Sequence, residues 1–407
     1  MKILLAHNFY GSSAPSGENT VYSAEKSLLE AAGHEVVEYT RNSDEIRAQG
    51  AWGALKGALS TPWNPIAYAS VRRTIERERP DVLHVHNTFP LLSPAIFHSA
   101  NQSATATVLT LHNYRTVCAA AIPMREGRPC TECIDRRSVT PALRYGCYRQ
   151  SRLATLPLAT MIALHRKLGT WQKHVDAFIA LTGFQRDRHV AAGLPPERMH
   201  VKPHFYPDPP SPLPWRERKA KVVFIGRLGE EKGVRFLIEA WRQWGEQAPQ
   251  LELIGDGPQR RELEDLAKGM DGKVRFLGQR PFSETRERLA GARLLVLPSV
   301  SFEGFPMVIL EAFAMGVPVA ASRLGSMPCL VQDDRNGVLF TSGNAEDLLR
   351  QVRGAWGDGD LLARMGAAAR EEFEARYTAE PNYRMLMDIY QAAIEHRRRM
   401  AGRARGR

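Results

Sequence analysis

Residues 222–244 read VVFIGRLGEEKGVRFLIEAWRQW and hold a strand, a loop and a helix in succession. The run from Val222 to Ile225 consists of β-branched and aromatic residues, which predicts a buried strand. A loop of glycines and charged residues follows, and the segment from Val234 to Trp244 is predicted to be a helix. A strand that leads through a short loop into a helix is the repeating unit of a parallel sheet with helices on both faces.

The same alternation of strand and helix continues on both sides of this stretch. In the second half of the chain, strands are predicted at 251–254, 274–277, 294–297 and 318–321, and helices at 259–267 and 307–315. In the first half, strands are predicted at 3–6, 35–39, 82–85, 105–111, 177–181 and 200–202, and a helix at 20–32. The pattern predicts an α/β fold of two tandem doubly wound Rossmann-like domains.

Length and proline content suggest where the domains meet. A chain of 407 residues is longer than one hydrophobic core usually supports, so two domains are expected. Five prolines between Pro207 and Pro214 predict a semi-rigid linker. The expected parts are a first domain at 1–205, a linker at 206–219, a second domain at 220–378, and a C-terminal helix with a basic tail at 379–407. That helix has an apolar face at 381–398 and is expected to pack back on the first domain.

The charge balance is basic. Lys and Arg number 55 and Asp and Glu number 44, which gives a net charge of +11. Such an excess favours an acidic neighbour, such as a phosphorylated substrate, nucleic acid or an anionic membrane surface. The arginine-rich tail from Glu395 is expected to be either a solvated fringe or a weak attachment to an anionic leaflet.

Neither a leader nor a membrane span is expected. The first residues, MKILLAHN, include too few apolar positions for a signal peptide. The longest apolar stretch, from Leu153 to Leu164, is about 12 residues long, whereas roughly 20 are needed to cross a bilayer. The protein is therefore expected in the cytoplasm, either free or peripheral on the inner face of the membrane.

The loop at 226–233 has the composition of an anion site. It fits neither the dinucleotide pattern G-x-G-x-x-G nor the P-loop with its terminal G-K-[ST]. It does place Arg227 and Lys232 among glycines, between a strand end and a helix N-terminus, where backbone N–H groups and cations favour a phosphate. An ordinary basic surface loop is the alternative.

Residues 302–311, FEGFPMVILE, place two carboxylates near another helix N-terminus. Pro306 suits the first helical position, which leaves Glu303 on the preceding loop and Glu311 about one and a half turns inside. Carboxylates accept hydrogen bonds from vicinal hydroxyl groups, so the pair suits a ribose and a hexose that flank a diphosphate. The alternative is a capping acid plus an unrelated helix glutamate. The backbone N–H groups available to an anion here are those of Gly304, Phe305 and Met307.

These motifs resemble the signature of the family 4 glycosyltransferases, retaining enzymes of the GT-B fold, in which two Rossmann-like domains face a central cleft. FEGFPMVILE is followed by AFAMGVPVAAS and preceded by VFIGRLGEEKG, LIGDGP and RFLG, in the order typical of that family. The resemblance covers essentially the whole second domain. In the first half it is looser, and rests on the strand–loop–helix start, on LHVHN at 83–87 and on TLHNY at 110–114.

The resemblance implies a nucleotide-sugar donor that is held mainly by the second domain. Its diphosphate would contact Arg227 and Lys232, its ribose Glu311 and its sugar Glu303. The implied donor-binding set is Gly17, Arg227, Lys232, Gly304, Phe305, Met307 and Glu311, and the implied catalytic set is Glu303, His112, Arg227 and Lys232. Acceptor-binding residues are not identified.

The first domain would form the acceptor side and add two residues to the donor site. A glycine that approaches the diphosphate maps to Gly17, although Ser16 stands before it where the family often has a second glycine. A strand-end histidine maps to His112, which would hydrogen-bond the donor sugar. A satisfied structural histidine is the alternative for that residue type.

The implied chemistry retains the anomeric configuration. Departure of the diphosphate leaves negative charge on it, and Arg227 and Lys232 would stabilise that charge, so no catalytic divalent metal is expected. The one D-x-D match, Asp358 to Asp360, lies between helical stretches and is interpreted as a helix cap.

Four of the five cysteines lie in a polar segment at about 115–150, interpreted as an insertion without a core of its own. Cys118, Cys130, Cys133 and Cys147 have a spacing that suits a structural zinc site, with free thiols or a redox pair as alternatives. Cys329 is isolated and expected to be packed. The basic and aromatic side chains around the segment would meet an acceptor phosphate or a membrane, or form a solvated loop; they are Arg136, Arg137, Arg144, Arg149, Arg152, Tyr145 and Tyr148.

The leading hypothesis is a retaining, hexosyltransferase-like glycosyltransferase that acts on a glycan or lipid-linked acceptor in cell-surface polysaccharide biosynthesis. Two alternatives stay open. One is a GT-B scaffold that binds nucleotide sugar without catalysis. The other is a zinc-containing nucleic-acid-binding protein, which would leave Glu303, Glu311 and the two-domain pattern unexplained; nucleic acid is therefore not expected as a partner.

Overall fold

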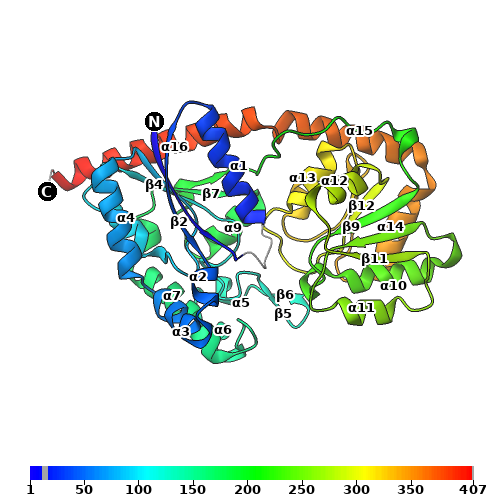
Figure 1. Cartoon of the computed structure of the whole chain (residues 1–407), viewed down its shortest axis with the longest axis horizontal. Coiled ribbons are helices and arrows are strands. Elements are labelled where there is room, and N and C mark those ends of the chain that lie inside the picture. Colours follow the sequence, from blue (N-terminus) through cyan, green and yellow to red (C-terminus); the bar gives the residue numbers. More distant parts are fainter. Residues whose placement is uncertain (12–16, 406–407) are drawn as a thin grey trace. The chain divides into compact units, whose positions relative to one another are not determined.

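The computed structural model describes residues 1–11 and 17–405 and divides into two compact units (Figure 1). The N-terminal unit comprises Met1–Pro123, Thr131–His204 and Ala379–Arg407, and the C-terminal unit comprises Met124–Cys130 and Phe205–Thr378. Within the described residues each unit is built on one six-stranded parallel sheet. The prediction of two doubly wound α/β domains is therefore confirmed.

The sheet of the N-terminal unit has the order β2-β1-β3-β4-β7-β8, and every pairing in it is parallel. Its strands are β1 (Lys2–Phe9), β2 (Glu35–Asn42), β3 (Val82–Asn87), β4 (Ala106–Thr110), β7 (Ala177–Ala180) and β8 (Met199–Val201). Strands β3, β4 and β7 are buried throughout. Burial on both faces explains why these strands are continuous apolar runs in the sequence.

The helices of this unit are α1 (Gly17–Ala31), α2 (Asp44–Arg47), α3 (Gly50–Ser60), α4 (Pro65–Glu78), α5 (Glu132–Asp135), α6 (Thr140–Tyr145), α7 (Arg152–Leu168), α8 (Thr170–Lys173), α9 (Gly183–Ala191) and α16 (Ala379–Arg405). Short 3₁₀ turns lie at η1 (Pro94–Ala100) and η2 (Pro196–Arg198). Helix α4 begins at Pro65, and the Asn64 side chain before it accepts hydrogen bonds from the backbone N–H groups of Ile66 and Ala67.

Helix α16 belongs to the core of the N-terminal unit, although it comes last in the chain. Its residues Leu386, Ile389, Tyr390 and Ala393 are buried among side chains of the N-terminal sheet. Figure 1 shows the helix, in red, running along the sheet near β4 and β7, and the three elements are in contact.

The C-terminal unit repeats the architecture, with the sheet order β11-β10-β9-β12-β13-β14. Its strands are β9 (Lys221–Ile225), β10 (Gln250–Ile254), β11 (Val274–Gly278), β12 (Leu294–Leu297), β13 (Val319–Ser322) and β14 (Gly337–Phe340). Its helices are α10 (Val234–Trp244), α11 (Arg260–Leu266), α12 (Phe282–Ala290), α13 (Met307–Ala314), α14 (Ala345–Gly357) and α15 (Gly359–Arg376), with 3₁₀ turns η3 (Trp215–Glu217), η4 (Glu230–Lys232), η5 (Gly245–Gln247) and η6 (Met327–Cys329).

Strand order fixes where each sheet can bind a ligand. In the C-terminal unit the chain runs outward from β9 through β10 to β11, and then returns to place β12 on the other side of β9. In the N-terminal unit the same reversal occurs between β1 and β3. Loops that leave neighbouring strands at such a point diverge and leave room for a ligand. The loops after β9 and β12 are the ones in which the sequence predicts the donor site.

The segment at 115–150 does not behave as an isolated insertion. Its buried side chains Ala119 and Ala142 form an apolar cluster with Leu158, Met161 and Ile162 of α7. Residues Met124–Cys130, which carry the small hairpin β5 (Met124–Arg125) and β6 (Arg128–Pro129), belong to the C-terminal unit. The apolar partners of this segment come from α7, so the segment packs on a neighbouring helix and does not form a separate core.

No helix in the described part of the chain combines the length and the apolar character needed to cross a membrane. The interpretation of Asp358 as a helix cap is confirmed. Its side chain accepts a hydrogen bond of 2.8 Å from the backbone N–H of Leu361, at the start of α15.

Replacing Asp358 with alanine should lower the free energy of unfolding by about 1 kcal/mol, because one of the first N–H groups of α15 loses its acceptor. Urea unfolding measures the change. Asp360→Ala is the matched control, since Asp360 lies in the same helical turn and is exposed. Equal destabilisation by the two substitutions would contradict the capping role.

Candidate donor site in the C-terminal unit

The loop after β9 is held in place by backbone hydrogen bonds to the loop after β10. The backbone N–H of Leu228 donates to the carbonyl of Asp256 at 2.9 Å, and that of Gln259 donates to the carbonyl of Leu228 at 3.0 Å. The Gly255–Pro258 turn therefore supports the loop from β10, as a tight turn does. The short turn η4 then carries the chain into α10.

The loops after β9 and β12 touch each other directly. Gly233 has φ +64°, and a Cβ atom there would lie 2.1 Å from the carbonyl oxygen of Pro298, so only glycine fits. The backbone N–H of Val300 donates to the carbonyl of Glu231 at 3.0 Å. These contacts fix the spacing between the two loops that carry the predicted site residues.

Lys232 and Glu303 meet across these loops. The Lys232 Nζ atom lies 2.7 Å from Glu303 Oε1, and both side chains are mostly buried. The hydroxyl of Ser299 donates to the same carboxylate oxygen at 2.8 Å. The structure thus brings together two residues that the sequence places 71 positions apart. Ser299 was not predicted as a site residue. Its position two residues after the predicted strand at 294–297 was the feature of the sequence that could have indicated it.

Arg227 lies on the loop after β9 with a partner of its own. Its guanidinium pairs with Glu231 at 2.7 Å, while the Arg227 side chain remains 60% exposed. Glu231 is far less exposed, at 13%, and was not predicted to contribute. The carboxylate anchors one side of the guanidinium, and the exposed remainder is free to bind an anion.

Helix α13 begins where the helix at 307–315 was predicted to begin, whereas the prediction that Pro306 takes its first position is wrong. Pro306 is the residue before the first helical position, Met307, and Glu303 lies on the preceding loop. Phe305 is buried, and its ring packs edge to face on Tyr377 with the centroids 6.2 Å apart. The Phe305 anchor fixes the loop that carries Glu303 and Gly304.

Glu311 lies one turn into α13 and is mostly buried. Burial raises its pKa from 4.5 to about 7. A carboxyl group with such a pKa changes its charge near neutral pH, and groups perturbed in this way concentrate at functional sites.

In the N-terminal unit, the prediction for Gly17 falls at the first residue of α1, and Ser16 lies outside the described residues. The start of α1 is joined to the loop after β4, since the Asn113 amide donates to Glu18 at 2.7 Å. On the same helix, the Asn19 side chain pairs with His7 of β1 at 2.9 Å. The first turn of α1 is therefore fixed to two strand ends.

His112 follows β4 and is buried in a stack of histidines. Its ring lies 5.2 Å from the rings of both His86 and His204, and its Nε2 atom lies 3.0 Å from His86 Nδ1. Burial holds the pKa of His112 well below its usual range, so the ring is neutral. Its Nδ1 atom is buried and has no hydrogen-bond partner among the described residues. With Thr110 and Asn113 it lines a cavity of about 40 Å³.

A buried charge network underlies these histidines and was not foreseen. Glu25 of α1 accepts a hydrogen bond of 2.9 Å from Lys202, and lies 3.1 Å from His84 Nδ1 and 3.2 Å from His86 Nε2. Although burial opposes ionisation, Lys202 and the two histidines hold the pKa of Glu25 well below its usual range. The alternation of histidines in LHVHN, which places both on one face of β3, was the available signal.

Helix α16 completes this network from the end of the chain. Asn382 accepts from Lys202 at 2.9 Å, and the Tyr390 hydroxyl pairs with His84 at 2.8 Å. Glu25, His84 and His86 have ligand atoms within 4.8 Å of one another, as a metal site requires. The ammonium of Lys202 already compensates the carboxylate, however, so we interpret the group as a charge network.

The structure does not confirm the predicted zinc site. Among the described residues, Cys118, Cys130, Cys133 and Cys147 do not come together as a group of metal ligands, and none of the five cysteines is in a disulfide bond. Burial, reinforced by the nearby Cys133 and Cys147, raises the pKa of Cys118 to about 12, which keeps that thiol protonated. Cys329 was expected to be packed but is exposed, because Met327 occupies the buried position of its 3₁₀ turn.

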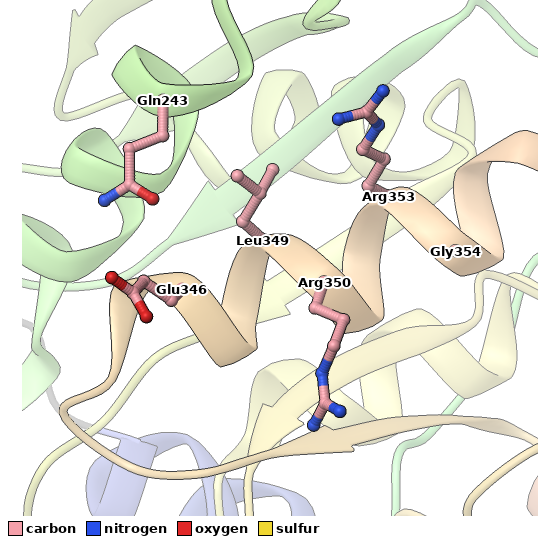
Figure 2. Close-up of a pocket in the computed structure, with 6 residues that line it drawn as sticks. All are labelled: Gln243, Glu346, Leu349, Arg350, Arg353 and Gly354. Atoms are coloured by element: carbon pink, nitrogen blue, oxygen red, sulfur yellow. The ribbon is translucent and has the colours of Figure 1, made fainter.

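A hollow of about 550 Å³ lies beside α14, away from the predicted residues (Figure 2). It is lined by Gln243, Glu346, Leu349, Arg350, Arg353 and Gly354. Figure 2 shows the two guanidinium groups extending to opposite sides of the helix. Because they do not converge, they cannot clamp a phosphate together, and we do not assign a site to this hollow.

Two family models match the chain. The Glycosyltransferase Family 4 model matches residues 17–207, and the Glycosyl transferases group 1 model matches residues 219–358. The crystal structure of HepE from Anabaena in complex with UDP has a TM-score of 0.66 at 18% identity, and the match covers 96% of this chain and 100% of that chain. At this identity the likeness shows the fold, which is GT-B.

Curated relatives agree with the family matches. The sulfoquinovosyl transferase SQD2 of Arabidopsis thaliana is 33% identical over 179 residues, covering 43% of this chain and 34% of the relative. WcaL of Escherichia coli K12, named for colanic acid biosynthesis, is 29% identical over 220 residues, covering 52% of each protein. The match thus spans between a third and about half of the length of these relatives. Together the matches and the fold support a GT-B glycosyltransferase of the family 4 and group 1 type.

The raised pKa of Glu311 predicts how stability depends on pH. Between pH 4.5 and 7 the folded state keeps a proton that the unfolded state releases, so stability falls as pH rises through this window. Relative to Glu311→Gln, the wild type should lose up to about 3 kcal/mol of unfolding free energy across it. Urea unfolding of both proteins at several pH values measures the difference. A difference that stays constant with pH would contradict the assigned shift.

Proposed function

We propose that the protein is a retaining glycosyltransferase that moves a hexose from a nucleotide-sugar donor to a glycan or lipid-linked acceptor in cell-surface polysaccharide biosynthesis. The observation that carries the proposal is the Lys232–Glu303 pair at the β9/β12 reversal, beside the exposed guanidinium of Arg227. Support for the pathway comes from WcaL, a relative named for colanic acid biosynthesis.

In the proposed complex, Arg227 and Lys232 bind the diphosphate. Breaking the bond from sugar to diphosphate places negative charge on the leaving group, and cations already in position stabilise that charge. The Lys232 ammonium group is fixed 2.7 Å from Glu303, and its other N–H groups can donate to the diphosphate. We therefore propose that the transfer needs no catalytic divalent metal.

The two glutamates would bind the sugar rings. Glu303 shares its oxygen with Ser299 and Lys232, which leaves its second oxygen available to accept from the donor sugar. Glu311 would accept from the ribose hydroxyls in its ionised form. Because its pKa is raised to about 7, donor binding should strengthen as pH rises through neutrality.

A structural neighbour and a buried nitrogen atom support the proposals for the nucleotide and for His112. HepE, which shares the fold, was crystallised with UDP, so a uridine diphosphate sugar is the donor class that we propose to test first. His112 offers a buried Nδ1 atom without a partner among the described residues, which suits a hydrogen bond to a sugar hydroxyl. We propose that contact, and we propose Gly17 as a diphosphate neighbour.

A thermal-shift screen of UDP, GDP, ADP and CMP sugars tests donor binding. A sugar nucleotide at 100 times its Kd should stabilise the wild type by about 2.7 kcal/mol. Arg227→Ala and Lys232→Ala should each abolish the shift. Arg353→Ala, in the hollow beside α14, is the matched control and should leave it intact. Equal shifts in the wild type and both loop variants would remove the assignment of Arg227 and Lys232.

Catalysis is tested separately by hydrolysis of the donor that binds. We expect the wild type to release nucleoside diphosphate, and Lys232→Ala to lower the rate by about 100-fold or more, as loss of one positioned charge typically does. Glu303→Gln should lower the rate while Glu311→Gln should chiefly raise the Kd. Donor binding without turnover, in the presence of a range of glycan acceptors, would favour a non-catalytic scaffold.

A further inference from the structure

Helix α3 buries glycines and exposes large apolar side chains, whereas an ordinary surface helix buries its large apolar side chains. Its inward face consists of Gly53 and Gly57, and a Cβ atom on Gly53 would lie 1.7 Å from the carbonyl oxygen of Ile46. Its large apolar side chains point to solvent, with Trp52 78% and Leu59 70% exposed. Burial against the protein therefore does not explain why these large side chains are apolar.

Helix α7, which contacts α3, also exposes apolar side chains. Its inner face, including Leu158 and Ile162, is buried in the cluster with the 115–150 segment. Its first turn exposes Leu153, at 83%, and Leu156. Helices α3 and α7 are in contact, as Figure 1 shows for the N-terminal unit. We call the exposed side chains of Trp52, Leu55, Leu59, Leu153 and Leu156 the α3–α7 patch.

The two segments of sequence that carry this patch are basic. The sequence contains neither Asp nor Glu at 46–75 or at 136–175, although a 40-residue stretch at the average frequency of the chain would hold about four. The basic residues there are Arg47, Lys56, Arg72, Arg73, Arg136, Arg137, Arg144, Arg149, Arg152, Arg166, Lys167 and Lys173. Arg152 is exposed beside Leu153, and its Nε atom donates to the carbonyl of Arg144 at 3.1 Å.

We propose that the α3–α7 patch docks on the surface of an anionic phospholipid bilayer. The apolar side chains would enter the boundary between headgroups and acyl chains, and Lys56, Arg149 and Arg152 would lie at the phosphates. Exposed apolar side chains on segments with basic and no acidic residues match a lipid surface of negative charge, and fit the mixed-charge surface of another protein less well. Asp44 and Glu45, which precede these segments on α2, are paired with Arg47 and Arg41. The proposal stands on this surface alone and does not depend on the donor site.

Sedimentation of the full chain with vesicles tests the proposal. We expect binding to vesicles of phosphatidylcholine with phosphatidylglycerol, weaker binding to phosphatidylcholine alone, and weakening by salt. The variant Trp52→Gln/Leu59→Gln/Leu153→Gln should bind about tenfold or more weakly, because three exposed apolar side chains are lost. Lys56→Gln and Arg152→Gln should each weaken binding to the anionic vesicles by about fivefold, and binding to neutral vesicles little.

Controls separate docking from general effects. Phe282→Gln removes an exposed apolar side chain of the C-terminal unit, and Arg261→Gln removes an exposed charge there; neither should change vesicle binding. The triple variant should unfold at the wild-type temperature, since its three sites are exposed. Vesicle binding that is equal in the triple variant and the wild type would overturn the proposal. So would a dimer in solution that the triple variant dissociates, because the patch would then bind a second copy.

Discussion

The close approach of the loops after β9 and β12 is the constraint on which the candidate site depends. A carbonyl oxygen of Pro298 occupies the space that a side chain at position 233 would need, and the Val300 amide binds the opposite loop. With the backbones fixed in this way, the side chains of Lys232 and Glu303 reach each other with little freedom left to lose. The site is thus organised by backbone packing, and its charges are consequences of that packing.

In the N-terminal unit, a buried ion pair fixes the positions of the neighbouring side chains. Glu25, Lys202 and Asn382 come from α1, the end of β8 and α16, and satisfy one another away from solvent. Removing one charge would leave the other buried and unpaired. The resulting loss of unfolding free energy exceeds the contribution of an exposed ion pair. The network therefore ties the last helix to the first, and holds the histidines beneath His112 at fixed spacing.

Local sequence patterns predicted most strands of the two sheets, whereas contacts between residues distant in the sequence could not be predicted. The strands from β9 to β13 were predicted to within about two residues, because buried parallel strands are uninterrupted apolar runs. Strand β14, GVLF, was missed although it is an apolar run, because it begins with a glycine, a residue that is rare in strands. Glu303 and Lys232 were each predicted from a motif, whereas Ser299, Glu231 and Lys202 act only through partners that the fold supplies. The segment with the four cysteines packs on α7, and the described residues do not bring those cysteines together as a group of metal ligands.

The pairing of Lys232 with Glu303 also constrains which ligand suits the site. A free phosphate that draws the lysine away would leave a mostly buried carboxylate with only the Ser299 hydroxyl as partner, and that loss offsets part of the gain. A ligand that brings an anion and a hydroxyl group together satisfies the lysine and the glutamate at once. A nucleotide sugar has both groups, joined at the bond that is to be broken. A ligand that carries both groups therefore suits the Lys232–Glu303 pair better than one that carries the phosphates alone.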